Sequence, residues 1–238
     1  MEIVGNMRSS AIFLTTTEVI NKESIANSDV VDKVEKRYNF AKTKIPKDFA
    51  NTIDFHGGRF TEGDTHVTIE DVSIGNKGMK ASVIGKTETA KKILEEVINI
   101  IDQAKIFEKI SDKIESWSFA TQFKVKLNIK SMSLLSERLG SFLKQTSSIF
   151  EKKDFSVEIH PVSISVIYVL KPDLEKLGRE LNVSEMSRLL KDIKGKELVI
   201  GFEGPEESYQ NIYTISVGLD TDSAISLIGN LEEAIRSA

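Results

Sequence analysis

The sequence contains no cysteine and only four prolines. Without cysteine the chain forms no disulfide and offers no thiolate metal ligand or thiol nucleophile. This absence is typical of proteins in a reducing compartment, and we expect an intracellular, cytoplasmic location. Long hydrophobic runs are lacking too, since no stretch approaches the roughly 18 apolar residues that a membrane-spanning helix needs. We therefore expect a soluble protein without a membrane partner.

A strong excess of charge of either sign is also missing. The 32 basic and 36 acidic residues give a formal net charge of −4 at pH 7. Proteins devoted to nucleic-acid binding usually carry a clearly basic surface, so the overall charge argues against that role. The first residues contain only one short apolar run, Ala11–Leu14, and we expect no signal peptide.

The sequence does contain periodic patterns over its 238 residues, which suffice for one large domain or two of ordinary size. Val67–Ile74 and Lys80–Ile84 alternate as the two strands of a hairpin, and a change of apolar phase near Glu70 indicates a bulge. Alternation in Phe119–Lys130 predicts a strand whose exposed side is basic. Mixed strands and helices, with hairpins that favour antiparallel pairing, predict an α+β fold.

A strand that leads through a glycine into a capped helix occurs twice, at Met79–Ala90 and at Tyr213–Ala224. From Thr87 and Thr221 onward the apolar positions of the two copies superpose without a gap, whereas the strands need a shift of one residue at the glycine. We interpret this match as a diverged internal repeat.

The first copy contains Gly85-Lys86-Thr87, which suggests a phosphate-binding loop. That motif needs a glycine five residues before Gly85, where the sequence has Lys80. The second copy also has no lysine at the corresponding turn. The shared glycine and threonine are therefore interpreted as a turn and a helix cap.

Apolar residues at helical spacing continue from Thr87 to Trp117 without an intervening glycine or proline. A helix of about 30 residues would be roughly 45 Å long. We expect it to join two lobes, residues 1–116 and 117–238, each an antiparallel sheet with helices on one face. A break near residues 103–105 fits the pattern equally well. The apolar positions also form an imperfect heptad seam, which favours self-association.

Asp54–His66 is the most polar and glycine-rich segment, and we expect a loop there. It holds two of the three histidines and three carboxylates. Imidazole and carboxylate together suit zinc or another divalent ion, or general acid–base chemistry. Their spacing matches no established metal signature, so we favour a structural loop over a site. The candidate metal ligands are His56, His66, Asp54, Glu62 and Asp64.

The segment Asp32–Lys47 has a local excess of basic residues, with Tyr38 and Phe40 among them. Basic and aromatic residues together could bind a phosphate backbone and stack on bases. In an acidic chain, a solvated helix face followed by a loop is the simpler interpretation. The candidate nucleic-acid-binding residues are Lys33, Lys36, Arg37, Lys42, Lys44 and Lys47, to which the later basic strand adds Lys124, Lys126 and Lys130.

Three functional hypotheses follow. No complete catalytic constellation is visible, so the favoured one is a non-catalytic binding or scaffolding protein of unknown ligand. It would self-associate as a homodimer, through the long helix or an exposed sheet face. The second is a metal-dependent hydrolase centred on His56 and His66, and the third is a nucleic-acid-binding protein that uses Lys33–Lys47. The sequence identifies no cofactor and no reaction.

Overall fold

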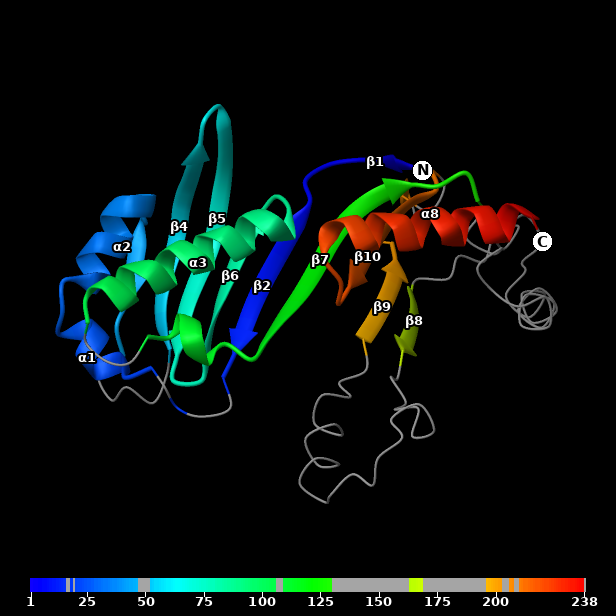
Figure 1. Ribbon diagram of the computed structural model, residues 1–238. Helices are drawn as coiled ribbons and strands as arrows, with labels where there is room; N and C mark the ends of the chain where they lie inside the picture. Colours follow the sequence, from blue (N-terminus) through cyan, green and yellow to red (C-terminus); the bar gives the residue numbers. More distant parts are fainter. Residues whose placement is uncertain are drawn as a thin grey trace, which may run out of the picture.

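The computed structural model has an α+β fold built on one large antiparallel sheet, which confirms the predicted fold class (Figure 1). It describes residues 1–15, 18, 20–46, 52–105, 109–129, 163–168, 196–202, 206–207 and 210–237.

Ten strands form the sheet, and nine of them follow the order β3-β4-β5-β6-β2-β7-β10-β9-β8. The short strand β1 pairs with the end of β7, beyond the residues that β2 reaches. The strands are β1 (Glu2–Ile3), β2 (Arg8–Leu14), β3 (Lys42–Lys44), β4 (Ile53–Glu62), β5 (Thr65–Gly75), β6 (Gly78–Ile84), β7 (Ser116–Lys126), β8 (Ser163–Tyr168), β9 (Lys196–Gly201) and β10 (Ile212–Val217).

Three of the α-helices, α2, α3 and α8, lie over the same face of the sheet (Figure 1). Helix α3 packs on β2 and β6, α2 packs on β4 and α3, and α8 packs on β7. The helices of the described part of the chain are α1 (Lys22–Ala26), α2 (Val30–Tyr38), α3 (Thr87–Gln103) and α8 (Thr221–Ser237), with a 3₁₀ turn, η1, at Ser111–Lys113. Within the described residues, every helix is too short or too polar to cross a membrane.

Strands β2 and β7 pair at the centre of the sheet and join its two halves. In one half β2 pairs with β6, the strand that leads into α3. In the other half β7 pairs with β10, the strand that leads into α8. Because the sheet continues through the β2–β7 pair, the expected division into two lobes is not confirmed.

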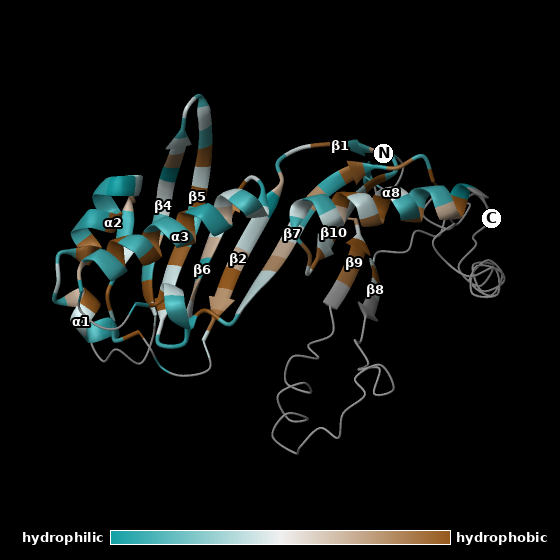
Figure 2. Ribbon diagram, viewed as in Figure 1, coloured by the Kyte–Doolittle hydropathy of each residue, from teal (hydrophilic) through white to brown (hydrophobic). Residues whose placement is uncertain are grey.

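Alternation along the strands separates a covered face from an open face. On β2, Ala11 and Phe13 are fully buried on the covered side, whereas Arg8 and Leu14 are exposed on the other. Hydrophobic and hydrophilic residues alternate in the same way along β4 and β5 (Figure 2). The buried side chains form two hydrophobic clusters, one with α2 and α3 and the other with α8.

The N-terminal ends of α3 and α8 meet at Thr87 and Thr221, which are both buried. The backbone N–H of Thr87 donates to Oγ1 of Thr221 at 3.0 Å, and the N–H of Thr221 donates to Oγ1 of Thr87 at 3.0 Å. Each threonine thus satisfies a free N–H group at the start of the other helix. Gly85-Lys86-Thr87 is therefore a helix start, as interpreted, but the expected threonine cap is wrong for this helix: Lys86 is at the N-cap position and Thr87 is the first helical residue.

The long helix expected from Thr87 to Trp117 is not confirmed. Helix α3 ends at Gln103, Lys105 adopts a left-handed conformation with φ of 52°, and Trp117 lies on β7. Asp102 then accepts a hydrogen bond from the N–H of Ile110 at 2.8 Å, which holds the returning chain against the helix end. The alternative break near residues 103–105 is where the helix stops.

The prediction of a loop at Asp54–His66 is wrong, because β4 and β5 run through this segment and only Gly63 and Asp64 lie between them. Phe55 and Phe60 are buried on the covered face, with Gly57 and Gly58 between them. Gly57 has a φ of 69°, and a Cβ at Gly58 would lie 2.5 Å from the ring of Phe40. The two glycines therefore permit a local shift of phase and a close ring contact within a strand.

The hairpin and the bulge are confirmed. Strands β5 and β6 pair antiparallel, and the register shifts between Ile69 and Asp71, beside the position at which the apolar phase changes. The helix predicted in the basic segment is present as α2, with Val30, Val34 and Tyr38 fully buried, whereas the loop expected after it contains the short strand β3.

Candidate binding face

The face of the sheet opposite α2, α3 and α8, here called the open face, is covered by no helix of the described chain (Figure 1). Residues directly opposite each other in an antiparallel pair lie on the same face, so the register defines this surface strand by strand. One ladder of paired residues crosses eight strands, from β4 to β8. It consists of Arg59, Thr68, Ile84, Arg8, Gln122, Ser216, Val199 and Ser165.

Side chains near the centre of the open face are small. Ser10 of β2 lies opposite Ser82 of β6 and Ala120 of β7, and Ser118 of β7 lies opposite Ile12. Aromatic side chains are on the covered face in every strand whose side chains the structure describes. Phe13, for example, makes an edge contact with Trp117 at 5.7 Å between ring centroids. Over the described strands, the open face therefore has short, mainly polar side chains at its centre and no aromatic ring on which a base could stack.

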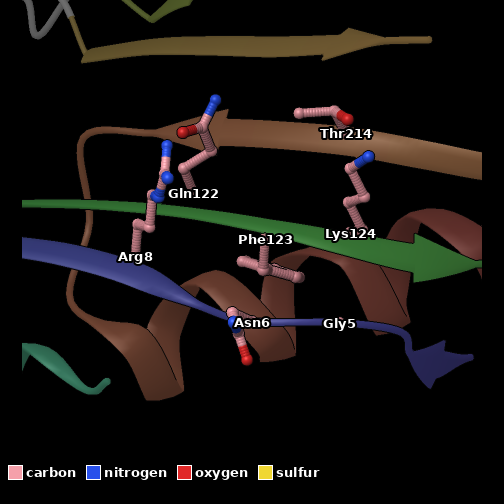
Figure 3. Close-up of a pocket in the computed structure, with 7 residues that line it drawn as sticks. All are labelled: Gly5, Asn6, Arg8, Gln122, Phe123, Lys124 and Thr214. Carbon is pink, nitrogen blue, oxygen red and sulfur yellow. The ribbon is translucent and has the colours of Figure 1, made fainter. Parts of the chain in front are cut away.

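Two adjoining hollows lie on this face and share Arg8 and Gln122. One, of about 440 Å³, lies at the point where the chain between β1 and β2 separates from β7; its other lining residues are Gly5, Asn6, Lys124, Thr214 and the buried Phe123 of the covered face. In Figure 3, Arg8, Gln122 and Lys124 extend from one side of the strands and Phe123 from the other.

The second hollow is about 300 Å³ in volume and extends toward β5 and β6, where Glu70, Asp71 and Lys80 line it. Both volumes fall within the range of small-ligand sites. The two hollows together form a shallow depression across the central strands β2 and β7.

Seven basic side chains are distributed over the open face. Arg8 lies 3.3 Å from Glu70, Lys80 lies 3.8 Å from Asp71, and Lys124 lies 2.8 Å from Glu207. The carboxylates on or against this face are Glu2, Asp54, Glu70, Asp71 and Glu207. The basic residues are Arg8, Lys42, Lys44, Arg59, Lys80, Lys124 and Lys126. Among the residues whose side chains the structure describes, basic groups therefore outnumber acidic ones on this face, although the whole chain has a net charge of −4.

The candidate metal ligands do not converge. Asp54 and His56 lie on the open face of β4, and Asp54 accepts a hydrogen bond from Oγ1 of Thr52 at 2.7 Å. His66 pairs with Thr61, five residues from His56 along β4, which is a distance of about 16 Å in an extended chain. Nδ1 of His66 lies 3.1 Å from Oγ1 of Thr61.

The two remaining candidates lie at the end of the β4–β5 hairpin. Glu62 forms an ion pair with Lys92 of α3, and Asp64 is exposed in the turn. Among the described residues, no group of three or more histidine, aspartate or glutamate side chains could hold a metal ion.

The candidate nucleic-acid-binding residues divide between the two faces. Lys42 and Lys44 lie on the open face, because they pair with His56 and Asp54. Lys33 and Lys36 lie on α2, over the covered face, and Lys33 forms an ion pair with Asp29 at 2.7 Å. Lys47 and Lys130 lie outside the described residues.

Arg37, the last member of this set, has a structural role. Its guanidinium lies 2.8 Å from Glu96 of α3, and the hydroxyl of Tyr38 donates to the same carboxylate at 3.0 Å. Burial, together with the charge of Glu96, raises the pKa of Tyr38 well above its usual value. The ring of Phe40 packs on the covered face against Gly58 and Phe55. Neither aromatic residue of the basic segment is therefore available to stack on a base.

The chain matches no protein-family model, and no curated protein has a sequence similar enough to suggest a function.

Arg8, Arg59, Lys80 and Gln122 were not singled out from the sequence, although they occupy much of the open face. A single polar residue of this kind is ordinary on the exposed side of a strand. Arg59 was also assigned to a loop. Strand phase alone could have placed them on one side, but the strand order that brings them together has no local signal.

Proposed function

We propose that this protein is a non-catalytic binding protein and that the open face of its sheet is the recognition surface. The observation that carries the proposal is the ladder of eight residues, six of them polar or basic, that crosses the sheet without cover from a described helix. A sheet face that supplies no aromatic or large apolar residues to the core contributes little to folding. A broad surface of this kind is suited to contact a partner along its length.

The other two functions considered receive different support. The dispersion of His56, His66 and their neighbouring carboxylates means that no observation favours a metal-dependent hydrolase. Self-association through a long helix loses its basis, because α3 ends at Gln103 and Trp117 lies on β7. The open face remains the surface on which either a second copy or another partner would bind.

We also propose that the two halves of the sheet are a diverged internal repeat, with the boundary of the two units near residues 116–117. Thr87 and Thr221 are 134 residues apart. The same spacing matches the inward-facing residues of β6, the strand before Thr87, with those of β10, the strand before Thr221. No shift at the glycine is then needed. The matched residues, all buried, are Met79 and Tyr213, Ala81 and Ile215, Val83 and Val217, Ala90 and Ala224, and Leu94 and Ile228.

The repeat is testable by superposition in an experimental structure. We expect residues 79–101 and 213–235 to superpose as one strand–helix unit at this single spacing. A superposition that required different spacings for the strand and the helix would contradict the repeat.

The binding proposal is testable by blocking the face with one bulky side chain. Ala120→Trp places an indole on the exposed centre of β7, and Asn99→Trp places the same group on the exposed side of α3 as a matched control. Wild type and both variants would be immobilised in equal amounts, and the proteins and nucleic acids that each retains from a cell extract compared. We expect Ala120→Trp to lose components that wild type and Asn99→Trp retain. Equal retention by all three, with unchanged thermal stability, would refute the proposal.

A further inference from the structure

We infer that the partner of the open face is a nucleic-acid duplex, which the face contacts through the phosphate backbone. This inference rests on the proposed function and names the class of partner. It is motivated by the distribution of charge, the absence of stacking surfaces, and the dimensions of the face.

The basic residues come from segments that are remote in the sequence and are brought together only by the sheet. Lys42 and Lys44 belong to β3, whereas Lys124 and Lys126 belong to β7, five strands away in the sheet. At about 4.8 Å between strands, this separation is roughly 24 Å. Arg8, Arg59 and Lys80 lie on strands between these two. A row of cations spread over this distance fits a partner with repeated negative charges better than one with a single anionic group.

The balance of charge on this face is opposite to that of the chain as a whole. Among the carboxylates of the face, Glu70, Asp71 and Glu207 are paired with Arg8, Lys80 and Lys124. Lys126 lies opposite Glu2, and Lys42, Lys44 and Arg59 outnumber the one carboxylate at the β3–β4 end, Asp54, so the local excess of positive charge lies at that end. A local field of this kind directs binding even when the net charge of a protein is negative.

The absence of aromatic side chains from the open face distinguishes between forms of nucleic acid. Proteins that bind single strands without sequence preference stack bases on aromatic rings, and the described strands present none on this side. A duplex keeps its bases stacked internally and offers phosphates on its surface. Hydroxyl and amide groups of residues such as Ser10, Ser118 and Gln122 can donate to phosphate oxygens, and their small size leaves space for a rigid cylinder.

The ladder of open-face residues has a suitable length. Eight residues on eight neighbouring strands span about 34 Å, which is close to one turn of B-form DNA. The groups with hydrogen-bonding capacity are therefore spread over about one helical repeat of a duplex rather than concentrated at one point.

The test is equilibrium binding of the full chain to a labelled DNA duplex about two helical turns long, followed by fluorescence anisotropy over a series of salt concentrations. The logarithm of the binding constant should fall linearly with the logarithm of salt concentration, with a slope of about −0.9 per phosphate contact. Lys42→Gln/Lys44→Gln should weaken binding and reduce the magnitude of the slope by about 2, because each lysine contributes about one contact. Lys33→Gln/Lys36→Gln is the matched control, since these two lysines belong to the same basic segment but lie over the covered face. This control should change neither the binding constant nor the slope.

Arg59→Gln provides a second variant in case the double substitution unfolds the edge strand β3. It should reduce the slope by about 1, with the circular dichroism spectrum of the folded protein unchanged. A single strand of the same sequence should bind more weakly than the duplex. Tighter binding of the single strand, or an equal effect of the two lysine pairs, would overturn the inference.

The remaining arms separate this inference from the proposed function. If the duplex did not bind at low salt, but Ala120→Trp still lost other retained components, the inference of a duplex partner would be refuted and the proposed binding face would stand. Duplex binding that polyglutamate displaces at equal charge concentration would show that the face takes acidic polypeptides instead. Duplex binding unchanged by Ala120→Trp would place the contact elsewhere and refute the inference, whereas the binding face would still be decided by the components that Ala120→Trp retains from the extract.

Discussion

The two faces of the sheet are made by the same strands but differ in the size, polarity and contacts of their side chains. On β2, Phe13 is fully buried against Trp117, while its neighbour Ile12 is only half-buried on the open face. The covered face holds the aromatic residues of the described strands, whereas the open face holds mainly serine, threonine and charged residues, with a few aliphatic ones such as Ile12 and Ile84. The comparison indicates a division of roles, in which one face supplies stability and the other is left for contact with a partner.

The largest expected effect compares Phe13→Ala with Ile12→Ala. Removing the buried ring of Phe13 leaves a cavity in the covered face and should lower the free energy of unfolding by about 3–5 kcal/mol. Ile12→Ala removes a half-exposed side chain on the open face and should cost about 1 kcal/mol. Urea denaturation measures both. Similar losses for the two variants would mean that the faces are not divided as described.

The second prediction concerns the helix junction on the covered face. Thr87→Val and Thr221→Val keep the shape of the side chain but each leaves one buried N–H group of the other helix without its acceptor. Each should destabilise the protein by about 1–3 kcal/mol. Because the residues contact each other, the double variant should depart from additivity by at least about 0.5 kcal/mol.

The control for this junction is Thr68→Val on the exposed side of β5, which should change the free energy of unfolding by less than about 0.5 kcal/mol. Urea denaturation of wild type, the two single variants and the double variant completes the cycle. Additive effects of Thr87→Val and Thr221→Val would show that the reciprocal hydrogen bonds do not act as one unit.

The third prediction uses pH to report on the covered face. Burial raises the pKa of Tyr213 from 10.0 to about 12, and its hydroxyl donates to the carbonyl of Ile129 at 2.8 Å. The folded state therefore holds this proton more tightly than the unfolded state does. The resulting stability is fully present below pH 10 and is lost as pH rises from 10 to about 12, by up to about 2–3 kcal/mol. Tyr38 acts in the same direction.

Denaturation of wild type and Tyr213→Phe, below pH 10 and between pH 10 and 12, measures this contribution. Tyr213→Phe should lose stability near neutral pH, because the carbonyl of Ile129 loses its donor, and should show a smaller further loss at alkaline pH. Ser216→Ala on the open face of β10 should retain the wild-type pH dependence. An unchanged alkaline profile in Tyr213→Phe would contradict the assigned cause of the shift.

Local periodicity was enough to predict several elements. The helix in the basic segment was predicted and is present as α2, and the bulge near Glu70 was predicted because the alternation changes phase there. The break after α3 was predicted only as one of two alternatives. Ile110 packs on the same cluster as the helix, so its apolar spacing continues the pattern from another element. Lys105, which adopts the left-handed conformation, is not glycine or asparagine and gives no stop signal.

The candidate face was less predictable than the elements, because it depends on which strands become neighbours. Lys33 and Lys42 belong to one basic segment of the sequence, yet the structure places them on opposite sides of the sheet. Arg8 and Gln122 are far apart in the chain and become direct neighbours in the β2–β7 pair. Alternation predicts that a strand has two sides, but only tertiary structure determines which side the helices cover.

The smallest expected effect on stability is that of Arg8, and it provides a sensitive test of the difference between the faces. The side chain of Arg8 is 62% exposed, and its ion pair with Glu70 spans 3.3 Å, so Arg8→Met should cost less than about 1 kcal/mol. The matched variant on the covered side is Arg37→Met, which removes contacts with Glu96 and with the ring of Tyr38 and should cost about 1–3 kcal/mol. Urea denaturation ranks the two. If Arg8→Met were the more destabilising, the ion pair with Glu70 would be part of what holds β2 and β5 in place, and the open face would be a structural surface rather than one left for a partner.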